Sequence, residues 1–105
     1  MVTPHMTDVV HEFKQAVTAK YPVSDIRLFG SQARGDATDA SDIDIFLQMA
    51  NLTKDMEQDV YNMAYDLELK YDCVIDVIVL SDAVVTTHAD HLPIYRNILR
   101  EGVRL

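Results

Sequence analysis

Three scarcities limit what this 105-residue chain can be. Cys73 is the only cysteine, so the chain cannot form an internal disulfide, which suits a reducing compartment. Lysine and arginine together number 9 against 17 acidic residues, which gives a formal net charge of −8. Because a surface of that sign repels phosphate backbones, we do not expect the chain alone to bind duplex DNA or RNA. An acidic surface is compatible with a basic protein partner, or with a nucleotide held through divalent cations.

Long apolar segments are also missing. No apolar run approaches the roughly 20 residues that a membrane-spanning helix requires. Residues 1–13 contain charged and histidine side chains in place of the apolar core of a signal peptide. There is no linker, internal repeat or low-complexity tract. The length and an apolar content of 49% predict one compact domain over residues 1–105, with no membrane contact and a cytoplasmic location.

Hydrophobic periodicity predicts three main helices. Thr3-Pro4 marks the start of the first, which Tyr21-Pro22 ends. Thr53 is a suitable N-cap for the second helix, and Gly102 stops the third, over residues 93–101. The side chains expected to face inward are Val9, Val10, Phe13, Ala16 and Val17 in the first, Met56, Val60, Met63, Ala64 and Leu67 in the second, and Ile94, Tyr95, Ile98 and Leu99 in the third.

Three segments have the composition of strands. Residues 25–29 and 42–48 alternate between polar and apolar positions, which predicts one buried face for each. Residues 73–80 are apolar on both faces apart from Asp76, which predicts a central strand covered on both sides and a buried Cys73 thiol. Residues 82–91 fit neither pattern. The order of elements predicts a small α/β sandwich, with one helical turn near residues 32–34 between the first two strands.

Two carboxylates are predicted to project side by side from the second strand. Side chains two residues apart on a strand point the same way, as Asp42 and Asp44 would, with Ile43 on the opposite face. Neighbouring strands lie about 4.8 Å apart, so Asp76 can join them if its strand pairs with theirs. Three converging carboxylates repel one another, and a divalent cation removes that conflict. Oxygen ligands of this kind suit Mg²⁺ or Mn²⁺.

A candidate phosphate-binding turn precedes these carboxylates. Gly30 lets the backbone approach a phosphate closely, and Ser31 offers an N–H and a hydroxyl as donors. Arg34, one helical turn further on, could clamp a phosphate or simply pair with Asp36 or Asp39. The turn and the carboxylates together predict a site for a metal-bound triphosphate.

The sequence at this point resembles a known family. Gly30-Ser31, ten residues, and then Asp42-Ile43-Asp44 is similar to the motif of the DNA polymerase β-type nucleotidyltransferase superfamily. The longer string LFGSQARGDATDASDIDIFL resembles its minimal nucleotidyltransferase branch, as do Asp76 within VIDVIVL and the closing ILREGVRL. The resemblance covers nearly the whole chain. It implies an α/β (α+β) fold of the polymerase β palm type, with a small mixed sheet and helices packed on it.

The resemblance also assigns a role to each motif residue. Gly30 and Ser31 would hold the β- and γ-phosphates of ATP, and Arg34 is a weaker candidate for the same task. Asp42 and Asp44 would bind two Mg²⁺ ions, for which Mn²⁺ can substitute. Asp76 would complete the second metal site and help deprotonate the attacking hydroxyl.

The family resemblance implies a protein partner. Larger members add a second domain that shapes the acceptor site, and minimal members typically act with a separate helical HEPN-domain ribonuclease toxin. The implied role is that of an antitoxin that transfers AMP to a toxin tyrosine, in a hetero-oligomeric complex. An acidic protein suits an RNA-binding partner electrostatically.

Several alternatives stay open from the residues alone. The chain could neutralise its partner by occlusion without catalysis, or could modify a small molecule or an RNA end. A P-loop ATPase is excluded because Asp36-Ala37 stands where lysine and serine or threonine are required. The segment from His88 to His91 could ligate zinc but lacks a fourth ligand. The tyrosines at 61, 65 and 71 fit packing or a partner surface.

Overall fold

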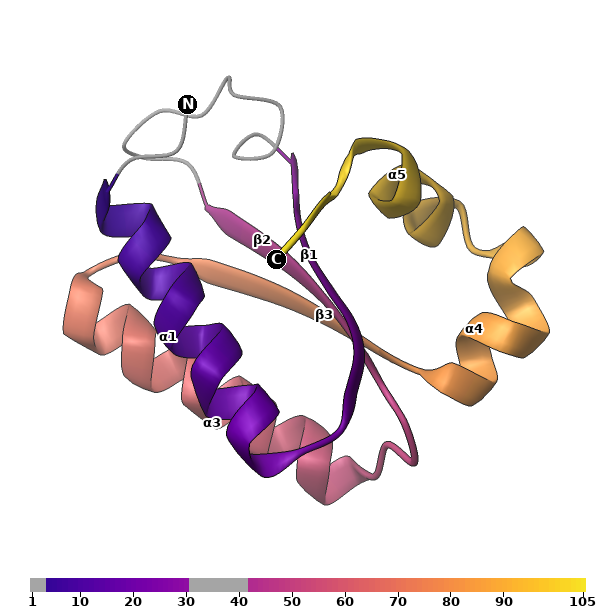
Figure 1. Ribbon diagram of the computed structural model, residues 1–105, viewed down its shortest axis with the longest axis horizontal. Coiled ribbons are helices and arrows are strands. Elements are labelled where there is room, and N and C mark those ends of the chain that lie inside the picture. The colour runs from indigo at the N-terminus through magenta and orange to yellow at the C-terminus, as the bar shows by residue number, and fades with distance from the viewer. Residues whose placement is uncertain (1–3, 31–41) are drawn as a thin grey trace.

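The computed structural model describes residues 4–30 and 42–105 of the chain (Figure 1). The three helices and three strands that the sequence predicts are present, together with a further short helix, a 3-10 turn and a two-residue strand. The elements are α1 (Pro4–Lys20), β1 (Val23–Phe29), β2 (Ile43–Met49), α3 (Lys54–Tyr71), β3 (Ile75–Ser81), α4 (Asp82–His88), the 3-10 turn η1 (Ala89–His91), α5 (Pro93–Glu101) and β4 (Val103–Arg104). None of the described helices has the length and apolar character needed to cross a membrane.

The described strands form one mixed sheet in the order β3-β2-β1-β4. β1 pairs antiparallel with both β2 and β4, whereas β2 and β3 run parallel and are joined through α3. The predicted α/β fold with a mixed sheet is therefore confirmed. The prediction of a central strand at residues 73–80 is wrong, because β3 has β2 as its single neighbour within the described sheet. Its apolar pattern reflects packing against helices on both faces, which does not require a strand on each side.

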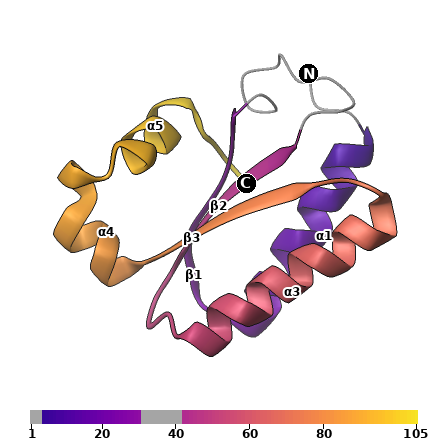
Figure 2. The same cartoon turned by 180° about the vertical axis from the view of Figure 1, so that it is seen from behind.

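The main hydrophobic core lies between the sheet and the pair α1 and α3, which run side by side across one face (Figures 1 and 2). The fully buried positions at its centre include Phe13 of α1 and Ile45 of β2. Ala16 is exposed, contrary to the prediction, since it lies on the solvent side of α1. The remaining buried members are Met6, Val9, Val10, Val17, Ile26, Leu28, Ile43, Leu47, Met49, Val60, Ala64, Leu67 and Ile75.

A smaller cluster forms on the opposite face, where α4 and α5 cover part of the sheet (Figure 1). Phe46 of β2 is fully buried there, and its ring centre lies 5.6 Å from that of Tyr95 on α5. Ile98 completes the inward face of α5, but Ile94 and Leu99 are 45% and 42% exposed. The prediction of four inward residues on this helix is half right, because a nine-residue helix meets the sheet along one narrow line.

Local signals set the ends of the elements. α1 begins at Pro4, and the Thr53 hydroxyl caps α3 by accepting from the Met56 N–H at 3.1 Å. The Ser81 hydroxyl caps α4 in the same way, accepting from Val84. α5 ends before Gly102, where a Cβ would collide with the carbonyl oxygen of Ile98, so the chain can turn into β4 there only without a side chain.

Candidate active site

The second and third predicted carboxylates lie next to each other in the sheet. Asp44 of β2 and Asp76 of β3 are register partners in the parallel ladder, and Phe29 of β1 stands opposite Asp44 on the other side. Asp42 precedes β2 by one residue and lies on the same face as Asp44, because side chains alternate along a strand. All three therefore occupy the face that carries α4 and α5. They lie at the end of that face beyond Phe46, at the start of β2 and β3.

Gly30 ends β1 directly against one of these carboxylates. Its φ is +71°, in the left-handed region that glycine adopts without strain. A Cβ built on Gly30 would collide with Asp44 Oδ2, so the carboxylate occupies the space that the missing side chain leaves. The predicted closeness of the glycine turn and the carboxylate strand is thus present between these two residues.

Asp76 and Asp42 form a close acidic pair. Asp76 is exposed at the sheet edge, but three effects raise its pKa: partial burial of its carboxyl group, a hydrogen bond with the Asp42 carboxyl, and the negative charge of Asp42. Glu68 of α3 adds a further negative charge to this environment. Its carboxylate accepts from the Ile75 N–H at 2.9 Å, which holds it at the start of β3. Sequence reasoning did not single out Glu68, because its position beside β3 depends on how α3 crosses the sheet.

The carboxylate oxygens of this acidic group are ligands of the kind that a divalent cation binds. Two of the three predicted carboxylates form a pair, and the third leans toward the glycine turn. Within residues 4–30 and 42–105, no three histidine, cysteine or acidic side chains converge as a set that could hold a metal ion. Asp44 leans toward Gly30, while Asp76 pairs with Asp42. Carboxylate oxygens are the ligands that Mg²⁺ prefers, and a cation between Asp42 and Asp76 would remove the repulsion that raises the Asp76 pKa. The residue types at this site are therefore suitable ligands for Mg²⁺.

Two predicted phosphate-binding residues, Ser31 and Arg34, lie outside the described residues. The possible zinc ligands His88 and His91 are both exposed, at the end of α4 and in η1. They belong to no metal-binding group among the side chains that the structure describes. Cys73 is half-buried and not fully buried as predicted, and burial raises the pKa of its thiol.

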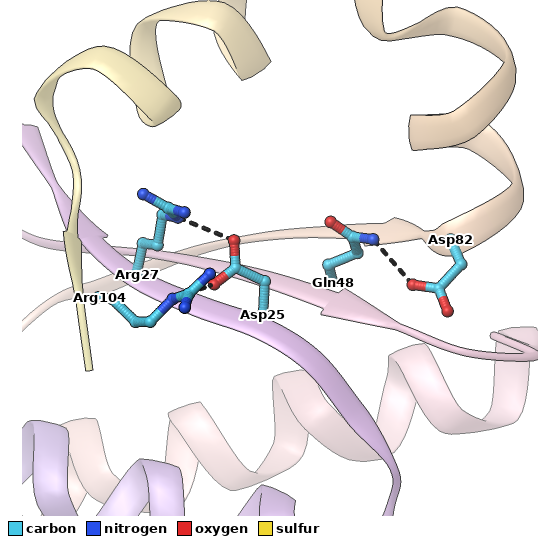
Figure 3. Close-up of polar contacts among 5 residues, drawn as sticks. All are labelled: Asp25, Arg27, Gln48, Asp82 and Arg104. Carbon is cyan, nitrogen blue, oxygen red and sulfur yellow. Dashed lines mark hydrogen bonds and ion pairs between the residues drawn. The ribbon is translucent and has the colours of Figure 1, made fainter.

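A polar cluster that the sequence did not reveal continues along the same face of the sheet (Figure 3). Asp25 Oδ2 accepts from Arg27 Nε at 2.8 Å, and Asp25 Oδ1 lies 3.5 Å from Arg104 Nε. Arg104 belongs to β4, so this ion pair ties the last strand to β1. Further along the face, Gln48 donates to Asp82 at 2.8 Å, which ties β2 to the first turn of α4. These contacts tie β4 and α4 to the sheet, toward the end of this face away from the acidic site.

Comparison with known proteins agrees with this arrangement. The family model for the nucleotidyltransferase domain matches residues 10–105. Two proteins of Methanocaldococcus jannaschii, each named "Putative protein adenylyltransferase", are similar to the chain. MJ0604 is 38% identical over 96 residues, covering 89% of this chain and 90% of its own. MJ0141 is 30% identical over 91 residues, covering 84% and 92%.

Solved structures share the fold. A "putative minimal nucleotidyltransferase" superimposes with a TM-score of 0.62 at 22% identity, covering 93% of this chain and 94% of its own. A chain from a toxin–antitoxin structure with AMP-PNP also reaches a TM-score of 0.62, at 18% identity, with 97% and 72% covered. The fold is thus the polymerase β-like fold of nucleotidyltransferases.

The chain belongs to the nucleotidyltransferase domain family. It is a nucleotidyltransferase enzyme.

Proposed function

We propose that this nucleotidyltransferase transfers AMP from ATP to a hydroxyl group of a partner protein. The observation that carries the proposal is the in-register pair of Asp44 and Asp76, with Asp44 against Gly30. Two further findings support it: the relatives MJ0604 and MJ0141 carry names of protein adenylyltransferases, and a chain of the same fold was solved with AMP-PNP. An ATP-consuming reaction of this kind suits the cytoplasm.

The residues divide the work by position. Asp42, Asp44 and Asp76 would hold two Mg²⁺ ions, or Mn²⁺ in their place. When bound, these ions would supply positive charge that steadies the triphosphate and lowers the barrier to phosphoryl transfer. Gly30 would let the phosphate chain approach the backbone without a steric block, with donors from the adjoining Ser31 and a clamp from Arg34.

Transfer itself is a substitution at the α-phosphorus of ATP. The acceptor hydroxyl oxygen forms a bond to that phosphorus, and the bond to the bridging oxygen of pyrophosphate breaks. The hydroxyl proton passes to the Asp76 carboxylate, which then releases it to water. Asp76 stands on the edge strand and is exposed, so a bulky protein acceptor can reach it.

The acceptor we propose is a tyrosine of a HEPN-domain ribonuclease toxin, which places this chain in the role of an antitoxin. The net charge of −8 favours a basic, RNA-binding partner over an acidic one. Two chains of the same fold were solved in toxin–antitoxin complexes, which supports a toxin partner in general terms.

The test is to incubate the purified chain with Mg²⁺, each nucleoside triphosphate in turn and the protein encoded by the adjacent gene, and to read the products by intact mass. We expect the partner to gain the mass of one or more AMP units with ATP. The matched control is the double variant Asp42→Asn and Asp44→Asn, which should bind the partner and transfer nothing. No nucleotidyl mass on the partner under any condition rejects the proposal. Protection of cells from the toxin by the double variant would show that occlusion suffices.

A further inference from the structure

α3 carries a row of large apolar side chains on its solvent side. Tyr61, Tyr65 and Leu69 recur at every fourth residue and are 39%, 57% and 67% exposed. Residues at this spacing lie on one side of a helix, about 12 Å from first to last. The opposite side of the helix, with Val60 and Ala64, already supplies the core. The row, which we call the α3 stripe, thus makes no contribution to the core.

Acidic side chains lie around the α3 stripe. Glu57 continues its row one turn before Tyr61, and at 100° per residue Glu68 and Asp66 flank its last turn on opposite sides, while the neutral Gln58 and Asn62 lie beside its first turns. The Tyr61 hydroxyl donates to Glu57 Oε1 at 3.1 Å, which fixes the orientation of this ring. An apolar row with acidic residues around it favours a partner surface that is apolar at its centre and basic at its edges. A second copy of this chain would bring these acidic residues together and is therefore disfavoured.

Of the two lysines of α3, Lys54 lies on the side of the stripe and Lys70 does not. Lys70 lies away from the stripe and pairs with Glu12 of α1 at 2.8 Å. Lys54 stands at the first residue of the helix, beside a shallow hollow that it shares with Glu57, Gln58 and Tyr61. The hollow gives the stripe a depression at one end, next to the Tyr61 ring.

The C-terminal end of the α3 stripe lies near the start of β3, on the opposite face of the sheet from the candidate active-site carboxylates. Glu68, next to Leu69, accepts from the Ile75 N–H at the first residue of β3, and its charge acts on Asp76 one residue further on. Val74, between the helix and β3, is 51% exposed. Because β3 is an edge strand of the described sheet and Asp76 is exposed on it, a protein seated on the stripe could reach Asp76 around that edge.

We propose that the α3 stripe is the docking surface for the acceptor protein, which binds it through a segment with apolar side chains flanked by lysine or arginine. This inference rests on the proposed function, because it names where the acceptor of that same site binds. Tyrosine is a residue type that often contributes most to binding at protein interfaces, which suits a stripe of only three large side chains.

Paired substitutions test the proposal by kinetics. Tyr65→Ala with Leu69→Ala should raise the KM for the acceptor protein about tenfold or more, while the KM for ATP stays as in the wild type. The matched control is Ile94→Ala with Leu99→Ala, which removes comparably exposed apolar side chains from α5 and should leave both constants unchanged. Equal effects of the two pairs on the acceptor KM would overturn the proposal.

Cross-linking separates a failure of docking from a failure of the proposed function. A photo-reactive phenylalanine analogue is placed at position 65, or at position 94 as a control, in the Asp42→Asn and Asp44→Asn background. The probe is the purified protein encoded by the adjacent gene. We expect a cross-link from position 65 to a basic, apolar segment of that protein and none from position 94.

Each result of the cross-linking experiment decides one of the two proposals. A cross-link at 65 without nucleotide transfer by the wild type would retain the docking surface and reject the transfer reaction. Transfer without a cross-link at 65, or a cross-link from 65 to a second copy of this chain, would reject the docking surface. Neither transfer nor a cross-link would reject both.

Discussion

The two faces of the sheet differ although the same strands form both. The face under α1 and α3 holds Ile26, Leu28, Ile43, Ile45, Leu47 and Met49, all buried and apolar. The alternate positions on the other face include the polar residues Asp25, Arg27, Asp44, Gln48 and Asp76 together with the apolar residues Phe29, Phe46, Ile78 and Leu80. A period of two residues lets one short segment contribute to the main core on one face and to a polar site on the other. The first face carries the main core, and the second combines a smaller core with the candidate site.

The largest expected effect is a loss of transfer activity without a loss of stability, from a substitution on the face that carries the candidate site. Asp44→Asn should lower nucleotidyl transfer by about 10³-fold, because it removes a charged ligand worth several kcal/mol to the transition state. The thermal midpoint should change little, since Asp44 is outside the hydrophobic core. Steady-state transfer rates and thermal unfolding are measured on the same preparation. A variant that loses activity only because it unfolds would contradict this division of labour.

The reverse experiment removes a core side chain from a neighbouring position on the same strand. Leu47 is fully buried, so Leu47→Ala should lower the free energy of unfolding by about 2–5 kcal/mol. The rate of transfer per folded molecule should remain near that of the wild type. Urea titration measures the first quantity, and activity well below the unfolding midpoint measures the second. An unchanged unfolding midpoint would show that this face does not carry the stability of the chain.

Gly30→Ala should affect both the backbone conformation after β1 and the Asp44 carboxylate of the candidate site. The left-handed φ of +71° costs a residue with a Cβ about 1–2 kcal/mol, and the new methyl group must displace the Asp44 carboxylate. We expect a moderate loss of stability and a loss of transfer of about tenfold or more. Gly102→Ala is the matched control, because its Cβ would collide with the Ile98 carbonyl at α5. The control should lose stability and keep its activity per folded molecule.

Asp76→Asn should show that repulsion between the carboxylates of the candidate site lowers the stability of the fold. In the absence of metal, the negative charges of Asp42 and Glu68 act against that of Asp76, so a neutral isostere should raise the thermal midpoint by a small amount. The same variant should be inactive in transfer. Differential scanning calorimetry in a chelating buffer measures the gain. A lower midpoint in the variant would mean that the carboxylates support the fold.

The smallest effect concerns the ion pair between α1 and α3. Hydrogen bonds from Lys70 and Tyr71 hold the pKa of Glu12 below its ordinary value of 4.5. A carboxyl whose folded pKa is depressed contributes stability above its ordinary pKa and loses it as pH falls through the lowered value. Glu12→Gln should therefore be slightly less stable than the wild type at neutral pH. The difference should shrink as the pH falls below 4.5. Thermal midpoints across this range check the sign.

Much of the fold could be predicted because its signals are local. The Pro4 start of α1, the Thr53 cap and the alternation along β2 depend on residues next to each other in the chain, and all three are confirmed. The roles of the site residues stay predictions, although the glycine turn, the paired carboxylates and the strand with Asp76 could all be located from the sequence.

The errors come from contacts between distant segments. β3 is apolar on both faces because helices cover it, and its edge position depends on the whole sheet order. The two-residue strand β4 and the ion pairs of Asp25 with Arg27 and Arg104 require the C-terminus to return to β1. α5 has only nine residues, so its hydrophobic periodicity does not determine which of its apolar side chains will face solvent.

The pairing of Asp44 with Asp76 has a consequence for how this family can diverge. Their spacing is a property of the backbone ladder between β2 and β3, and any side chains that keep two strands parallel preserve it. Side chains elsewhere can therefore change while the backbone positions of Asp44 and Asp76 keep their separation. Chains only 18–22% identical to this one share its architecture. A strand register can thus hold two carboxylates side by side independently of the side chains that surround them.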